Sequence, residues 1–246
     1  MKGRLLKAAF FCRLCTVRKL NKKEFPYVFM SVVLTILVNQ LVYQDSRLIT
    51  RYFHHWNIAI PIDYTFTLVP WTLIIYIGAY LIWTVFYGSI ALLDDRTESE
   101  RFFAAVNSAK IILLFCYLVF PTTADIRPEL TGTTVWDNLF RTLYGIDPSD
   151  NYFPSLHCFA SWMCFIGVRN KKQFPLWWKI LAFVLAIAVF VSTITTRQHV
   201  IVDIFGGIAL AELSYALSSI KAIPRTYTKV STWIMVHVFR RQGLEG

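Results

Sequence analysis

Charged residues are scarce in this chain. Lys, Arg, Asp and Glu make up 16% of its 246 residues, whereas hydrophobic residues make up 56%. The mean hydropathy is +0.48. Soluble domains carry about 25% charged residues, so this composition excludes an ordinary soluble globular protein. It predicts a chain that lies largely in lipid.

The cysteines predict neither a disulfide framework nor a zinc site. The five cysteines are odd in number, and none lies in a segment predicted below to face outward, so no disulfide framework follows. Cys12 and Cys15 have CxxC spacing, but no second pair or nearby His completes a zinc site. The chain also lacks a linker, an internal repeat and a low-complexity tract, which predicts a single domain.

The chain contains several long apolar runs. A helix that crosses a bilayer needs about 20 mostly apolar residues. Six such runs lie near residues 26–44, 66–93, 102–120, 153–168, 177–196 and 199–220. They predict an all-α integral membrane protein with six transmembrane helices in one domain, residues 25–222. A basic cytosolic or interfacial segment, residues 1–24, precedes it, and a basic cytosolic tail, residues 223–246, follows.

The placement of the basic residues predicts an orientation. Of the 25 Lys and Arg residues, 20 lie in segments 1–24, 94–110, 169–179 and 221–246. The other five, Arg47, Arg51, Arg127, Arg141 and Arg197, lie in the alternate loops. By the positive-inside rule both termini are cytosolic, and the loops 45–65 and 121–152 and the turn at 197 face outward. Orientation, rather than nucleic-acid binding, therefore explains the net charge of +10.

Two polar clusters lie at outward ends of predicted spans three and four. Arg127 precedes Pro128 after span three, and its guanidinium suits phosphate oxygens. The run NYFPSLHCFASW opens span four and places Ser155 and His157 in the first helical turn, where free backbone N–H groups attract anions. Taken alone, each cluster also fits a non-catalytic role: Arg127 as a solvated loop residue, and His157 as a capping or interfacial residue.

A third cluster, VSTITTRQHVIVDIFGG, joins spans five and six and contains Ser192 and Arg197. His199 and Asp203 are four apart, so on a helix they share one face. A carboxylate bonded to one ring nitrogen fixes the tautomer and leaves the other lone pair free, as a nucleophilic His needs. A structural hydrogen bond would give the same spacing. Together with His157, however, the three clusters predict a nucleophile, an acid and phosphate donors on one membrane face.

These residues resemble the type 2 phosphatidic acid phosphatase superfamily, also called lipid phosphate phosphatases. Its signatures run KxxxxxxRP, PSxH and SRxxxxxHxxxD. The second is met in full by PSLH at 154–157, and Ser192, His199 and Asp203 stand at the spacing of the third. Arg127 and Pro128 match the end of the first.

Two cations of these signatures are missing. Phe120 stands at the Lys of the first signature, and Thr193 replaces the Arg that follows Ser192. Arg197 is available to supply one of them. The run STITTRQHVIVD is similar to the STxxTKQH pattern of the branch that contains inositol phosphorylceramide synthase, which transfers a phosphorylated head group between lipids.

The resemblance implies a route in two steps without metal or other cofactor. His199 attacks phosphorus to give a phosphohistidine, with Asp203 orienting it. His157 protonates the leaving alkoxide and then activates the acceptor. Four residues would bind the phosphate, namely Arg127, Ser155, Arg197 and Ser192.

The first functional interpretation is therefore a membrane lipid phosphate phosphohydrolase at the cell membrane, with its site outward. The second is a lipid phosphotransferase that uses the same His pair. A third, a catalytically silent lipid transporter or scaffold, would not need His157, His199 and Asp203 together. The partners expected are a phosphorylated lipid substrate and membrane lipids, with phosphatidate, phosphatidylglycerophosphate, isoprenoid pyrophosphate and sphingoid phosphates all open. Segment 133–146 has apolar residues at helical intervals, which indicates an interfacial helix or one packed on the bundle.

Cysteine labelling tests the predicted orientation. In intact cells, a membrane-impermeant maleimide should react with a cysteine placed at position 133 and should reach one at position 171 only after lysis, because the charge distribution puts these positions on opposite sides. Labelling of position 171 alone in intact cells would show that the orientation is opposite to the predicted one.

Overall fold

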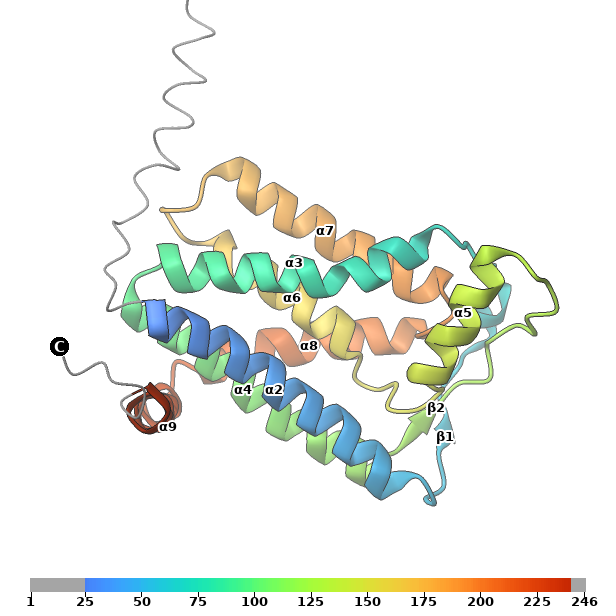
Figure 1. Ribbon diagram of the computed structural model, residues 1–246, viewed down its shortest axis with the longest axis horizontal. Coiled ribbons are helices and arrows are strands. Elements are labelled where there is room, and N and C mark those ends of the chain that lie inside the picture. The colour runs from blue at the N-terminus through green and yellow to red at the C-terminus, as the bar shows by residue number, and fades with distance from the viewer. Residues whose placement is uncertain (1–24, 240–246) are drawn as a thin grey trace, which may run out of the picture.

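The computed structural model describes residues 25–239, which form a helical bundle (Figure 1). The long helices are α2 (Phe25–Thr50), α3 (Thr72–Leu93), α4 (Arg96–Val119), α6 (Leu156–Arg169), α7 (Leu176–Thr195), α8 (Ile201–Leu217) and α9 (Ala222–Phe239). A shorter helix, α5 (Val135–Ile146), lies at one end of the bundle and agrees with the helix predicted in segment 133–146. The predicted N-terminal segment 1–24 and residues 240–246 of the predicted tail lie outside the described residues.

Four of the described helices, α2, α3, α4 and α7, are long and apolar enough to cross a membrane. Helices α8 and α9 pass the same test only as a pair, which is bent by 90°. Helix α6 is apolar but has only 14 residues. These features support a multi-pass membrane protein with four or five long spans, whereas the count of six stays a prediction.

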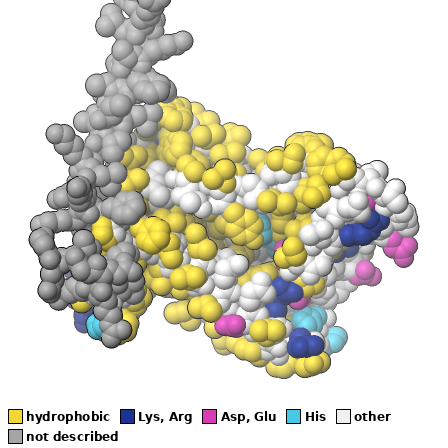
Figure 2. All heavy atoms as spheres, viewed as in Figure 1, with side chains coloured by type: hydrophobic (Ala, Val, Ile, Leu, Met, Phe, Trp, Pro, Cys, Tyr) yellow, Lys and Arg dark blue, Asp and Glu magenta, His cyan; other side chains and the backbone are white. Residues whose placement is uncertain are grey.

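Helix α7 shows how the chain suits a lipid environment. One face, with Ala182, Ala186 and Val189, is buried against the bundle. The opposite face is also apolar and is exposed, at Ile180, Val184, Ile187 and Val191. A surface helix of a soluble protein would carry polar residues on that face, so its apolar character indicates contact with lipid tails. Figure 2 shows apolar side chains covering much of the helical part of one face of the molecule.

The bundle has two distinct ends. At one end, segments predicted to be cytosolic meet: Lys171 Nζ pairs with Glu98 at 2.5 Å and Asp94 at 3.3 Å, and Arg101 Nε donates to Ser218 Oγ at 3.1 Å. The opposite end holds α5, the 3-10 helix η1 (Pro61–Thr65), β1 (Trp56–Asn57) and β2 (Thr122–Thr123). The segments that the charge distribution assigned to one side thus lie together.

The pairing of β1 with β2 differs from the all-α prediction. The two strands are parallel, with Trp56 opposite Thr122, and Trp56 N also donates to Pro121 O at 2.9 Å. The pairing satisfies backbone groups of two loops that cross the end of the bundle. Two-residue strands leave no alternating pattern in the sequence, and so this small sheet was not predicted.

Helix α9 lies in the segment predicted as a basic tail. It packs against α4 and α2, where Tyr227 Oη donates to Ser31 Oγ at 3.2 Å and Thr228 Oγ1 donates to Glu100 at 2.8 Å. The described part of the tail is therefore an ordered element of the bundle. Hydroxyl side chains on one helix face make these contacts, and Arg225 and Lys229 lie at exposed positions of the same helix.

Helices α6 and α8 approach each other closely at Gly207. A Cβ atom there would lie 2.7 Å from Ser155 O and 2.9 Å from Phe159 N, both backbone atoms that cannot rotate away. Glycine at a helix–helix contact lets the two backbones come together, as in membrane bundles generally. The start of α6, which carries His157, is thereby held against the start of α8.

Replacing Gly207 by Ala should destabilise the protein, because overpacking costs about 1–3 kcal/mol. The matched control is Gly78→Ala in α3, where nothing lies within 4 Å of an added Cβ, so that the better helix propensity of Ala raises stability or leaves it unchanged. Thermal unfolding in detergent should show a midpoint lower by about 2–4 °C per kcal/mol for Gly207→Ala. Equal midpoints for the two variants would show that the contact is not tight.

Candidate active site

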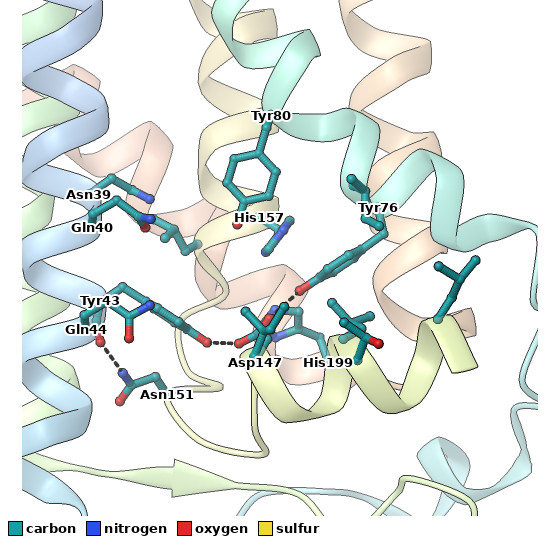
Figure 3. A pocket seen from close by; sticks show the side chains of 16 residues that line it. Asn39, Gln40, Tyr43, Gln44, Tyr76, Tyr80, Asp147, Asn151, His157 and His199 are labelled. Atoms are coloured by element: carbon teal, nitrogen blue, oxygen red, sulfur yellow. Dashed lines mark hydrogen bonds between the residues drawn. The ribbon is translucent and has the colours of Figure 1, made fainter. Parts of the chain in front are cut away.

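A cavity of about 290 Å³ lies between α2, α3 and α5, and both predicted catalytic histidines line it (Figure 3). Its other polar lining residues are Asn39, Gln40, Tyr43, Gln44, Tyr76, Tyr80, Thr142, Asp147 and Asn151. Apolar side chains of α5 complete the wall, so that the predicted helix of segment 133–146 forms one side of the cavity.

His157 is held in a box of aromatic rings at the start of α6. Its ring stacks on Tyr76 at 4.2 Å between centroids, and the rings of Trp83 and Tyr80 lie 5.2 and 5.7 Å away. The side chain is 6% exposed, and its Nε2 atom is buried without a hydrogen-bond partner among the described residues. Buried ring nitrogens usually have a partner, so this atom is available to exchange a proton with a bound group.

His199 is oriented by Asp203, as the HxxxD spacing predicted. His199 Nδ1 lies 3.1 Å from Asp203 Oδ2, which also accepts a hydrogen bond from Val200 N at 3.1 Å. The predicted reason is wrong, however, because α8 begins at Ile201 and His199 precedes it. The turn before α8 brings the ring onto the carboxylate, and this turn contains Arg197 in the left-handed region at φ 58°. With Nδ1 engaged, Nε2 is the ring nitrogen left for chemistry.

The two histidines are close enough to act on one bound group. Their ring centroids lie 5.9 Å apart, and both residues line the same cavity although His157 lies in α6 and His199 in the turn before α8. Tyr152 lies on another side of His199, at 5.4 Å. Burial raises the pKa of Tyr152, so its phenol stays protonated near neutral pH.

Arg197 holds the turn that carries His199. Its Nε donates to Ile126 O at 2.8 Å and its Nη1 donates to Asp63 O at 2.5 Å. Asp63 Oδ1 in turn accepts from Ile201 N at 2.9 Å. Arg197 does not line the cavity. Its contacts therefore favour a role in positioning the turn over a role in binding phosphate.

Arg127 contacts Gln198, the residue that precedes His199 in the chain. Its Nη2 donates to Gln198 Oε1 at 2.5 Å and to Asp147 O at 2.8 Å, and its guanidinium lies 4.4 Å from the Tyr144 ring. Burial raises the pKa of Tyr144 to about 12, so the phenol keeps its proton and donates to Thr196 O at 3.0 Å. Arg127 Nε and Gln198 Nε2 are buried without partners among the described residues. Each of the two residues thus keeps an unpartnered donor, although neither lines the cavity.

The two predicted phosphate-binding serines have structural contacts. Ser155 caps α6, accepting from Cys158 N at 3.3 Å, and its own N–H donates to Asp203 O at 3.3 Å. Ser192 is fully buried and donates to Val189 O at 2.7 Å. Neither serine lines the cavity.

Phe120 and Thr193, the two positions where the signature cations are missing, lie outside the cavity lining. Phe120 stacks on Trp56 with centroids 6.3 Å apart, and Thr193 is buried and donates to Phe190 O at 2.8 Å. No Lys or Arg is among the described residues that line the cavity, whereas Asp147 is. The site is therefore less cationic than the family signatures predict.

Asp147, Tyr43 and Tyr76 were not predicted. Asp147 follows the last residue of α5, and its carboxylate accepts hydrogen bonds from Tyr43 Oη and, at 2.8 Å, from Tyr76 Oη (Figure 3). These residues come from α2, α3 and the loop after α5, so no local motif connects them. The one available signal was an acidic residue in a loop predicted to face outward.

No group of three or more His, Cys, Asp or Glu side chains that could hold a metal ion is present within residues 25–239. His54, in the loop before β1, packs edge-on against Trp56 with centroids 4.7 Å apart.

Comparison with protein families supplies independent evidence. The family model of the PAP2 superfamily matches residues 39–217, a segment that contains both histidines, Asp203 and most of the bundle. No curated protein and no solved structure matches the chain. Because the family match spans well over half of the 246 residues, the chain belongs to the PAP2 superfamily, and this membership supports a phosphatase-type enzyme.

Proposed function

We propose that the protein is a membrane lipid phosphatase that works through a phosphohistidine at His199 and needs no metal. One observation carries the proposal: His199, with Nδ1 on the buried carboxylate of Asp203, faces the same cavity as His157, at a centroid distance of 5.9 Å. An oriented nucleophile and a second titratable group in one cavity are the minimum for covalent catalysis. A transporter or scaffold has no use for this arrangement.

The reaction proceeds in two steps, transfer of the phosphoryl group to His199 and its release to water. His199 Nε2 attacks phosphorus and forms a P–N bond while the P–O bond to the lipid breaks, and protonated His157 gives its proton to the departing oxygen. His157, now neutral, then accepts a proton from water as the water oxygen attacks phosphorus and releases His199. Splitting the displacement in two lets the same imidazole act first as acid and then as base.

Charge on the transferring group would be stabilised by donors around the nucleophile. The buried, unpartnered Arg127 Nε and Gln198 Nε2 support this assignment, as does the position of His157 at the start of α6, where backbone N–H groups favour an anion. For Ser155, Ser192 and Arg197, direct phosphate contact stays a prediction, and their contacts favour a role in holding these donors in place.

The proposed membrane arrangement has six crossings, with both termini in the cytosol. Helices α6 and α8, with 14 and 17 residues, are the short crossings. The two histidines lie near the starts of these helices, at the end opposite the Lys171–Glu98 cluster, which supports an outward-facing site in the cell membrane.

Single substitutions test the catalytic pair. His199→Ala and His157→Ala should each lower turnover of a lipid phosphate about a thousandfold, because the two act as one unit and their losses are not additive. Asp203→Asn should lower it less, since the ring keeps a hydrogen-bond partner. His54→Ala is the matched control, as this exposed His lies at the same end outside the cavity. Retention of a tenth of the activity by His199→Ala would exclude the covalent route.

A second candidate, transfer to a lipid alcohol, is favoured by one specific observation. The cavity is lined by Asp147 and by no Lys or Arg among the described residues. A phosphodiester carries one negative charge fewer than a fully ionised monoester, so this wall repels it less. The similarity of STITTRQHVIVD to the head-group-transferring branch points the same way.

Product analysis separates the two candidates. The enzyme is given phosphatidate labelled in phosphate, or a phospholipid labelled in its head group, each with and without added diacylglycerol. For a hydrolase, water-soluble label should appear at a rate that does not depend on the lipid alcohol. Label that appears only in a new lipid, and only when the alcohol is present, would replace hydrolysis by transfer. His199→Ala supplies the background for both assays.

A further inference from the structure

A second cavity of about 260 Å³ adjoins the catalytic one between α2 and α3. The two cavities share Asn39, Gln40 and Tyr80 in their walls. Along α3 the catalytic cavity is lined by Tyr76 and Tyr80 and the second cavity by Tyr80, Trp83 and Tyr87, so the second cavity continues the first toward the other end of the bundle. A single elongated ligand can therefore occupy both.

The second cavity is exposed on its lipid-facing side and is bounded by Lys110 on its buried side. Ile36, Tyr80 and Thr84 on its rim are exposed, whereas Lys110 and Ala160 are 2% and 4% exposed. Val32, Trp83 and Tyr87 contribute apolar surface to the remaining wall, and Thr35, Asn39 and Gln40 contribute polar groups. Such a lining suits the first carbon atoms of an acyl chain together with a small polar group.

Lys110 is the unusual member of this cavity. The charge distribution grouped it with the cytosolic segment 94–110, but it lies in the interior of α4, well inside a predicted span. Its Nζ donates to Asn39 Oδ1 and lies 4.9 Å from the Phe159 ring. Among the described residues no carboxylate is within ion-pair distance of Nζ. An ammonium group has three donors and is costly inside a membrane, so its presence indicates a functional contact.

We propose that Lys110 and Asn39 bind the acyl carbonyl oxygens of the lipid substrate. This inference rests on the proposed function, because it takes the phosphate to lie at His199. The carbonyl groups of a diacyl or N-acyl lipid are a few bonds away from phosphorus, toward the chains, and Asn39 is a residue that the catalytic and second cavities share. Lys110 would then donate to a carbonyl oxygen in a region that excludes water, where a charge-assisted hydrogen bond is strong.

The proposal assigns a substrate class. Acyl lipids offer carbonyl oxygens at this depth, whereas isoprenoid phosphates have no oxygen beyond the phosphate groups. An isoprenoid chain would therefore offer no acceptor to the Lys110 donors that the bond to Asn39 Oδ1 leaves free, which costs binding free energy. The enzyme should thus select acylated lipid phosphates over isoprenoid phosphates.

Lipid binding to His199→Ala protein in nanodiscs tests the proposal without turnover. The probes are dioleoyl phosphatidate and its dialkyl ether analogue, which has the same phosphate and chains but no carbonyl oxygens. The ester lipid should bind about tenfold more tightly than the ether. Adding Lys110→Met should remove the preference by weakening ester binding alone, and Asn39→Leu should do so in part. Lys229→Met, at an exposed position of α9, is the matched control and should leave the preference intact.

Thermal midpoints separate a loss of binding from a loss of folding, because Lys110→Met removes the hydrogen bond to Asn39 Oδ1 as well as the charge. Equal binding of ester and ether, absence of binding by either, or an equal loss of both in Lys110→Met would overturn the proposal. Failure of the proposed function is recognised separately, as turnover that survives His199→Ala.

Discussion

Asp203 connects the two segments on which the site depends. Its carboxylate accepts from His199 Nδ1 and from Val200 N, and its main-chain carbonyl accepts from Ser155 N, two residues before His157. One buried residue therefore orients His199, the proposed nucleophile, closes the first turn of α8 and fixes the start of α6. Gly207, one turn further along α8, permits the backbone contact that these bonds require.

Around this contact the basic residues serve mainly to hold backbone in place. Arg197 joins its own turn to residues 63 and 126, and Arg127 joins Gln198 to the end of α5. Besides the two histidines, the cavity itself presents tyrosines, amides and one carboxylate, so the proposed phosphate site has few cations. A weakly cationic site in a lipid-facing bundle suits a substrate that is held largely by its apolar part.

The sequence was informative where the chemistry is local or periodic. Apolar runs located α6, α7 and α8 to within a few residues, but they ended too early for α2, which extends to Thr50, and misplaced the starts of α3 at Thr72 and α4 at Arg96. Helix α9 was not predicted, whereas the HxxxD spacing identified the His199–Asp203 contact. Tertiary packing could not be predicted from the sequence, because the partner of an Arg side chain, whether phosphate or a carbonyl group, depends on loops distant in the chain. Asp147 gained its role from Tyr43 and Tyr76 on two other helices, and Lys110 was grouped with a cytosolic segment because a charge count does not resolve helix depth.

The covalent step at His199 is the central claim, and trapping the intermediate tests it most directly. An activated nitrophenyl phosphate ester needs no acid to leave, so in His157→Ala protein the first step proceeds while release to water is slow. After an alkaline quench, which preserves phosphohistidine, peptide mass spectrometry should find a phosphoryl group on His199. Release of nitrophenol without a phosphoryl group on His199, or with one on a different residue, would contradict the account.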